Sequence, residues 1–199
     1  MQLDNPDRGF GYKESGPLDM RMNPQKGLSA AQLLARTPVD KLARLLEANA
    51  DEPHADAIAA ALKAAAIETT DALHETIRDA LRELRLSGDE ENASVRRTFQ
   101  ALRIAVNDEF ATLDWFLRSL PDCLAAGGRI AILTFHSGED RRVKKAFQSG
   151  HRDGLYESIS DEVVRASRDE VRANPRASSA KLRWAIRTQS PTAAAPITS

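Results

Sequence analysis

The sequence predicts an α/β fold in which a block of short helices precedes a buried strand and its flanking helices. Residues 28–93 contain several amphipathic segments of helical period, and a longer apolar stripe of the same period runs from about 95 to 120. A continuously apolar run, Arg129 to Phe135, then stands between a glycine pair and a new helix start. Helix, buried strand and helix in this order form half of an α/β ligand-binding unit, whose ligands gather at the carboxyl ends of the strands.

Length and composition fit a globular chain that can bury a core. The chain has 199 residues, of which 42% are apolar, and no window approaches the ~18 consecutive apolar residues that a membrane helix needs. The first residues lack the charged and apolar regions of a signal peptide. We therefore expect a cytoplasmic protein with no membrane partner. The single cysteine, Cys123, is expected to be a small buried side chain, since it lies among apolar neighbours.

The net charge of −1 conceals two oppositely charged segments. Residues 37–93 carry 6 Lys and Arg against 13 Asp and Glu, a net −7, whereas residues 129–187 carry 13 against 8, a net +5. Clustered cations favour polyanions through counterion release, so the second segment is the candidate nucleic-acid surface. Two differently solvated faces would give the same composition, and that alternative stays open.

The first part of the chain predicts a loop followed by a helical subdomain. Residues 1–27 are rich in Gly, Pro, Asp and Asn and show almost no period, which is typical of an ordered loop or connector. Ser29 can cap a short helix that continues to Arg36, and Thr37 can cap the next helix with Pro38 in its first turn. These features begin a helical subdomain that we expect to span residues 28–93.

Two further helices and a polar hinge complete this subdomain. The segment from Pro53 to Ala66 is alanine-rich and favours a helix by propensity. From Thr70 onward, apolar residues recur every four positions, as in an amphipathic helix. The polar segment 87–92 is predicted to be a hinge that leads back to the other part of the fold.

A single long helix is predicted from about Val95 to Leu120, with one buried apolar face. Beside that face, five polar residues fall in one band at about 100° per residue. They are Arg96, Gln100, Arg103, Asn107 and Asp114. Contact with a ligand and anchoring of neighbouring loops both explain such a band, and the sequence does not separate them.

The last third predicts an interior strand, a helix and a second strand. Gly127 and Gly128 suit a helix end, and the run 129–135 is too continuously apolar for a one-sided strand, which predicts an interior parallel strand. The segment 137–140 has the form of a capping box, so its two acidic residues have a structural explanation. Residues 181–187 alternate basic and apolar side chains, as in a half-buried strand with one charged side.

The common catalytic constellations are missing from the sequence. It contains no Cys/His metal spacing, no nucleophile elbow and no P-loop, so we expect no metal and assign no catalytic residue. His136 is the best single candidate for chemistry, because it follows a buried strand and titrates near neutral pH. A hydrogen bond into the loop that starts the next helix is the alternative role for His136.

Four blocks in order carry a close resemblance to the bacterial small-subunit rRNA cytosine-N4 methyltransferases of the MraW or RsmH type. The blocks are GPLDMRM (16–22), RTFQALRIAVNDE (97–109), FHSGEDR (135–141) and NPRASSAKLR (174–183). The resemblance extends to about Arg187. It implies a partial Rossmann-like S-adenosylmethionine-dependent methyltransferase domain with an inserted all-α subdomain. The implied division is a first methyltransferase segment 1–27, the insert 28–93, the C-terminal methyltransferase part 94–188 and a disordered tail 189–199.

The resemblance also implies the reaction, the cofactor and the partners. It implies an rRNA (cytosine-N4-)-methyltransferase that uses S-adenosylmethionine on a cytidine in the decoding region of 16S rRNA, on the small ribosomal subunit. The family carries its glycine-rich cofactor loop ahead of the part matched here, and Gln2 alone is carried over as a cofactor-binding position. The candidates for contact with RNA or the target base are Arg103, Asn107, His136, Arg141, Arg176 and Lys181. One departure is Gly138, where the family usually has leucine.

One alternative and one consequence accompany this expectation. The chain could be a catalytically inactive remnant that binds RNA or a protein through its basic half, because the cofactor loop is missing from its 199 residues. A strand left exposed at one edge would also have unpaired backbone groups, so we expect self-association of the chain.

Overall fold

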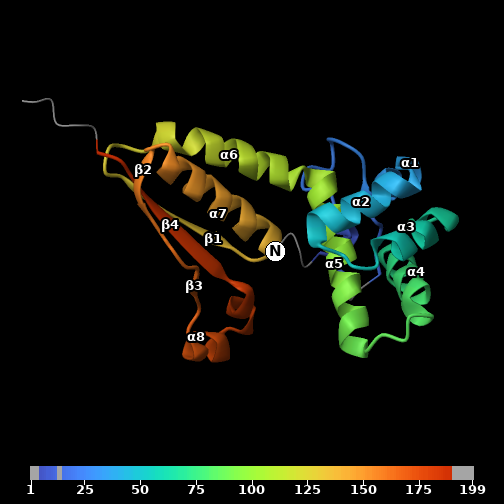
Figure 1. Ribbon diagram of the computed structural model, residues 1–199. Coiled ribbons are helices and arrows are strands. Elements are labelled where there is room, and N and C mark those ends of the chain that lie inside the picture. Colours follow the sequence, from blue (N-terminus) through green and yellow to red (C-terminus); the bar gives the residue numbers. More distant parts are fainter. Residues whose placement is uncertain (1–4, 13–14, 190–199) are drawn as a thin grey trace, which may run out of the picture. The chain divides into compact units, whose positions relative to one another are not determined.

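The computed structural model describes residues 5–12 and 15–189, which form a mixed α/β structure, mostly helical, with a small antiparallel sheet (Figure 1). The chain divides into two compact units, Met1–Glu109 (unit 1) and Phe110–Ser199 (unit 2), and each is described by itself. The expected cofactor contact Gln2 lies outside the described residues, and so does the expected disordered tail beyond Gln189. The expected segments 1–27, 28–93 and 94–188 stay a prediction.

Unit 1 is a helical bundle preceded by a loop. Its described elements are the 3-10 helix η2 (Pro6–Arg8) and the helices α1 (Ala30–Arg36), α2 (Val39–Ala50), α3 (Ala55–Ala64), α4 (Thr70–Arg82) and α5 (Gly88–Asn107). The predicted helical segments are present. Ser29 caps α1 through a capping box with Gln32, whereas Pro38, expected in the first turn of α2, is its N-cap residue.

The predicted long helix is in fact two helices, α5 and α6 (Glu109–Cys123), and the predicted hinge at 87–92 is helical. Ser87 forms a capping box with Glu90, so the acidic run begins α5 instead of interrupting the chain. Asp108 takes a left-handed conformation with φ 52°, which ends α5. The apolar spacing continues across the break, and for that reason periodicity alone did not locate it.

The core of unit 1 is formed by its helices together with Leu18 and Met20 of the loop before α1. α2 packs against α5 and α3, and α3 packs against α4. Leucines and isoleucines from each of these helices are almost fully buried. They include Leu42, Leu46, Ile58, Leu73, Ile77 and Leu102. The amphipathic pattern of each helix therefore matches the face that it buries.

Unit 2 is a small sheet with helices along one side. Its described elements are α6, the strand β1 (Arg129–Thr134), α7 (Ser137–Arg152), β2 (Tyr156–Ile159), β3 (Val164–Arg165), α8 (Arg168–Ala173), η3 (Pro175–Ser179) and β4 (Lys181–Arg187). Gly127, expected at a helix end, has φ 69° in a turn that leads into β1, after α6 has already ended at Cys123. Cys123 is exposed, so the prediction of a buried thiol was wrong.

The expectation that residues 129–135 form a parallel strand was also wrong, whereas the expected interior position of this strand stays a prediction. β1 pairs antiparallel with β4, and among the described residues it lies at the end of the order β1-β4-β2, with β3 on β4. Ile130 and Ile132 pack into the core of unit 2, whereas Ala131 and Leu133 are exposed. Apolar residues on both faces made the strand look doubly buried.

One face of the sheet is covered and the other is open. Leu117 and Leu120 of α6 and Val143 and Phe147 of α7 share one core cluster with Ala185 of β4, and Figure 1 shows both helices along the same side of the sheet. The opposite face carries apolar side chains that are exposed or half-buried. These are Ala131, Leu133, Val164, Leu182, Trp184 and Ile186.

The strand predicted at residues 181–187 is present as β4, but one of its basic side chains is buried. Arg183 lies on the covered face, only 7% exposed. Its Nε and Nη2 atoms donate to the two carboxylate oxygens of Asp140 at 2.7 and 3.2 Å. The pair ties the first turn of α7 to the middle of the sheet, so the buried charge has its partner.

Candidate functional site at the carboxyl end of β1

The helix start after β1 is built by His136 and Glu139. His136, and not Ser137 as the capping-box pattern suggested, is the N-cap residue of α7, and its Nδ1 accepts a long hydrogen bond of 3.4 Å from the Glu139 amide. The other ring nitrogen, Nε2, lies 3.3 Å from Oε1 of Glu139. His136 therefore has the structural role that was the alternative to a chemical role.

Glu139 closes the same turn from the other side. Its Oε2 accepts a 3.0 Å hydrogen bond from the amide of Phe135, the residue before the cap. Burial raises the pKa of this carboxyl group, but the bonds from His136 and Phe135 outweigh burial and lower the pKa to about 2. Glu139 is thus an acceptor fixed in its charged form, which makes it unsuitable as a proton donor at neutral pH.

The ring of Phe110, which the sequence analysis did not single out, fills the space beneath this turn. It lies 5.8 Å from the His136 ring, and the Arg142 guanidinium carbon stands 3.8 Å above its centroid. A Cβ atom at Gly138 would lie 2.6 Å from Cζ of Phe110. Gly138, at the position where the family usually has leucine, therefore leaves the space that the Phe110 ring occupies.

Three of the expected RNA contacts lie on elements that meet at this end of unit 2. Lys181 begins β4 directly opposite Thr134, the last residue of β1. Arg141 is an exposed residue in the second turn of α7, and Arg176 is exposed in η3, which leads into β4. The sheet register thus places Lys181 beside the loop that carries His136.

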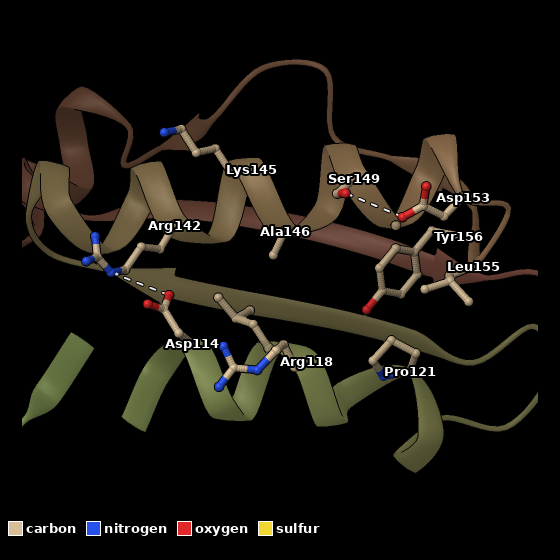
Figure 2. A pocket seen from close by; sticks show the side chains of 12 residues that line it. Asp114, Arg118, Pro121, Arg142, Lys145, Ala146, Ser149, Asp153, Leu155 and Tyr156 are labelled. Carbon is tan, nitrogen blue, oxygen red and sulfur yellow. Dashed lines mark hydrogen bonds and ion pairs between the residues drawn. The ribbon is translucent and has the colours of Figure 1, made fainter. Parts of the chain in front are cut away.

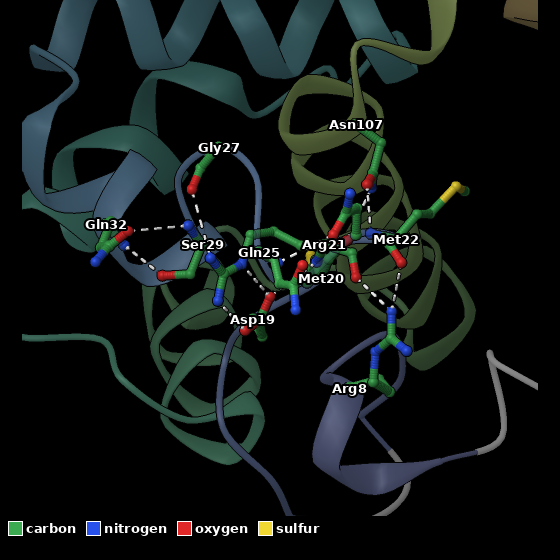
Figure 3. Close-up of polar contacts among 11 residues, drawn as sticks. Arg8, Asp19, Met20, Arg21, Met22, Gln25, Gly27, Ser29, Gln32 and Asn107 are labelled. Atoms are coloured by element: carbon green, nitrogen blue, oxygen red, sulfur yellow. Dashed lines mark hydrogen bonds and ion pairs between the residues drawn. The ribbon is translucent and has the colours of Figure 1, made fainter.

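Two more of the expected RNA contacts, Asn107 and Arg103, belong to unit 1, and Asn107 holds the loop of this unit in place. Nδ2 of Asn107 donates to the Met20 carbonyl at 2.8 Å, and Oδ1 of Asn107 accepts from the Met22 amide at 2.7 Å. Arg8 donates to the carbonyl of Met22 from the opposite side, as Figure 3 shows. Met20 has φ 61°, a conformation that these bonds stabilise.

Arg103 and a second arginine are also paired within unit 1. Arg103 donates from Nε and Nη2 to the two carboxylate oxygens of Glu109, at 2.8 and 2.9 Å. Arg21 forms a similar fork with Asp19, which lowers the pKa of Asp19. The polar band on the predicted long helix therefore includes residues that anchor neighbouring segments, which was one of the two interpretations left open.

A groove of about 580 Å³ runs between α6 and α7 in unit 2 (Figure 2). Asp114 and Arg118 line it from α6, and Arg142 lines it from α7, with Arg142 Nε 3.4 Å from Asp114 Oδ1. Tyr156 borders one end, and burial raises the pKa of its phenol. Both cations and anions line this groove together with apolar residues, so its lining does not select one class of ligand.

At the helix start after β1, the amides of Phe135 and Glu139 already have side-chain partners and are not open to S-adenosylmethionine. A cofactor held at the carboxyl end of β1 would use the amides that begin α7. The side chains of His136 and Glu139 already accept from amides of this turn. Within the described part of the chain, no group of His, Cys, Asp and Glu side chains could hold a metal ion. No helix of that part has the length and hydropathy to cross a membrane.

Comparison with known proteins places the chain among methyltransferases. The model of the MraW methylase family matches residues 1–188. The ribosomal RNA small subunit methyltransferase H 2 of Alkaliphilus metalliredigens is 51% identical over 194 residues, which cover 94% of this chain and 56% of the relative. The methyltransferase H 1 of Lachnoclostridium phytofermentans is 47% identical over 196 residues, covering 94% and 53%. The chain thus spans about half the length of the curated relatives that it matches.

Proposed function

Because this chain belongs to the MraW methylase family, we propose that it acts in S-adenosylmethionine-dependent methylation of small-subunit rRNA, at the N4 amine of a cytidine in the decoding region. The observation that carries the proposal is the identity of about half of all positions over 94% of the chain to proteins named ribosomal RNA small subunit methyltransferase H. The activity of the whole relative is proposed here for a chain that spans about half of its length.

The residues proposed to contact RNA are Arg141, Arg176 and Lys181. Their support is the position of their elements around the end of β1, and the net charge of +5 over residues 129–187. Arginine and lysine on phosphates, together with contacts to a splayed base, are the usual means of binding RNA at a single-stranded site. For Arg103, Asn107 and His136, contact with RNA stays a prediction, since each would first have to leave an internal partner.

Methyl transfer to this amine depends mainly on how the reacting groups are positioned. The exocyclic amine of cytosine is a poor nucleophile, so transfer depends on holding it in line with the methyl group and on excluding water. S-adenosylmethionine, when bound, supplies the methyl group. The part assigned to this chain is to hold the RNA backbone. His136 is given no proton-transfer role because its Nδ1 is committed to the α7 amide, and cofactor contact by Gln2 remains a prediction.

The direct test is transfer of a labelled methyl group to small ribosomal subunits that lack the modification. We expect the full chain to label the 16S rRNA at one cytidine, which mass spectrometry of RNase fragments would locate. Calorimetric titration with S-adenosylmethionine gives an independent measurement on the same sample. Absence of both labelling and cofactor binding would remove the catalytic proposal for this chain.

The second candidate is an RNA-binding module without catalysis. It is favoured by the side-chain partners that the amides of Phe135 and Glu139 already have, because these two amides are then unavailable to a cofactor at the end of β1. This candidate expects 16S rRNA binding that is unaffected by S-adenosylmethionine. In filter-binding titrations against salt, the Lys181→Ala and Arg176→Ala variants should each reduce the salt slope by about 1. Lys41→Ala, an exposed lysine in the acidic segment of unit 1, is the matched control and should leave the slope unchanged.

A further inference from the structure

Two cations stand directly opposite each other where β3 meets β4. Arg165 of β3 and Lys181 of β4 are partners in the antiparallel register. Opposite residues of antiparallel strands project to the same side of the sheet, with Cβ atoms about 4.5–5.5 Å apart. On its other side, Lys181 is the partner of Thr134 in β1. The three residues therefore form one row across the sheet, at the end of β1.

The sheet fixes the direction in which this row points. Oγ1 of Thr134 donates to the carbonyl of Lys181 at 3.2 Å, which holds the start of β4 against β1. Side chains two positions apart on a strand share a face, so Lys181 projects to the same side as Arg183. Arg183 is bonded to Asp140 in the first turn of α7. Lys181 and Arg165 thus lie on the face that carries α7.

The charges of this pair are not compensated within the described part of the chain. Neither Arg165 nor Lys181 forms an ion pair with a described residue. The acidic side chains that begin α7 are engaged elsewhere, because Asp140 accepts from Arg183 and Glu139 accepts from the Phe135 amide. Like charges directly opposite each other weaken a strand pair. An anion bound between the two side chains would remove this repulsion.

We propose that Arg165 and Lys181 together bind one phosphate group of the RNA backbone, which adds Arg165 to the residues that contact RNA. This inference rests on the proposed function, because it takes small-subunit rRNA as the partner. Arg165 is exposed, and its guanidinium can donate two hydrogen bonds to a phosphate, while the ammonium of Lys181 supplies a second positive charge.

Filter binding of the full chain to 16S rRNA over a range of salt concentrations tests the contact. Arg165→Gln should weaken binding at least about fivefold and reduce the salt slope by about 1. Arg165→Lys keeps the charge and should retain most of the affinity. Arg168→Gln removes the same charge from an exposed residue of the same unit, and as the matched control it should change the affinity less than about twofold.

A charge reversal separates RNA contact from a purely structural role. Arg165→Glu sets a carboxylate opposite Lys181, so the strand pair gains an attraction in place of a repulsion. The urea midpoint should stay unchanged or rise, while affinity for 16S rRNA should fall at least about tenfold. A residue that acts only in folding would lower the urea midpoint together with the affinity.

A double-mutant cycle tests whether the two cations share one phosphate. Arg165→Gln and Lys181→Ala should be non-additive in their effects on RNA affinity, because each variant disturbs the same contact. Strict additivity, or an Arg165→Gln variant that binds as tightly as the wild type, would overturn the shared site while the proposed function stands. A wild-type chain that does not bind 16S rRNA would remove the proposed function, and this inference with it.

Discussion

The two units bury their apolar residues to different extents. In unit 1, helices form one core, and residues such as Leu42 and Ile77 have no exposed surface. In unit 2, α6 and α7 cover one face of the sheet, while Leu133 and Val164 on the other face are each 52% exposed. This difference indicates that unit 1 is stabilised mainly by hydrophobic burial, whereas the stability of unit 2 depends more on individual polar and aromatic contacts.

The largest loss of stability is expected from Arg183→Ala, in unit 2. It leaves the Asp140 carboxylate, 16% exposed, without its fork partner, and removing one member of a buried pair costs about 3–5 kcal/mol of the free energy of unfolding. Hydrogen exchange should show the loss of protection in unit 2 alone. Arg172→Ala, which breaks a fully solvated pair with Asp169, should change little. Equal effects of the two variants would contradict a special role for the Arg183 pair.

Leu102→Ala tests the core of unit 1. Leu102 has no exposed surface, so truncation leaves a cavity that should lower the free energy of unfolding by about 2–5 kcal/mol. Urea denaturation followed by fluorescence and hydrogen exchange would measure it. Leu84→Ala, at a leucine that is 46% exposed, should have an effect within about 0.5 kcal/mol. A similar loss for both leucines would mean that burial does not dominate unit 1.

Gly138→Leu tests the aromatic packing of unit 2. Because a Cβ atom there would lie 2.6 Å from the Phe110 ring, we expect a loss of about 1–3 kcal/mol from overpacking. Combining it with Phe110→Ala should restore part of the loss, so the two changes should be non-additive in a double-mutant cycle. Strict additivity in urea unfolding would show that the glycine and the ring do not compete for space.

The smallest loss of stability is expected from Glu139→Gln, at the start of α7 in unit 2. Since the pKa of Glu139 is lowered to about 2 from 4.5, the carboxylate stabilises the fold above pH 4.5 and loses that contribution as the pH falls toward 2. In urea titrations at successive pH values, Glu139→Gln should lower stability by about 1–2 kcal/mol at neutral pH and flatten this acid dependence. Glu162→Gln, at an exposed residue of the same unit, should retain the wild-type pH profile.

The sequence predicted the helices of unit 1 best where a side-chain cap and an apolar stripe agree, as in α1 and α4. Ser29 and the leucines and isoleucines of α4 are examples of local signals that need no distant partner. The break at Asp108 was not predictable in this way, because the apolar spacing continues across the left-handed residue, and the loop that the neighbouring Asn107 contacts is far away in the sequence.

The errors in unit 2 come from features that no local pattern encodes. The burial of Arg183 depends on Asp140, which lies 43 positions away, and the cap at His136 depends on a ring nitrogen that statistical cap preferences do not favour. The apolar run of β1 gave the strand correctly but not its neighbours, because an apolar side chain looks the same whether it is buried or exposed. The position of Lys181 beside the β1 end likewise required the antiparallel register.

The packing of Phe110 against Gly138 has a consequence for how this part of the protein can vary. A larger side chain at position 138 is compatible with the fold only if the ring at position 110 becomes smaller or turns away. The two sites, separated by α6, β1 and the loops between them, should therefore change together among descendants of this sequence. A library randomised at both positions and selected for folding should recover them as a correlated pair.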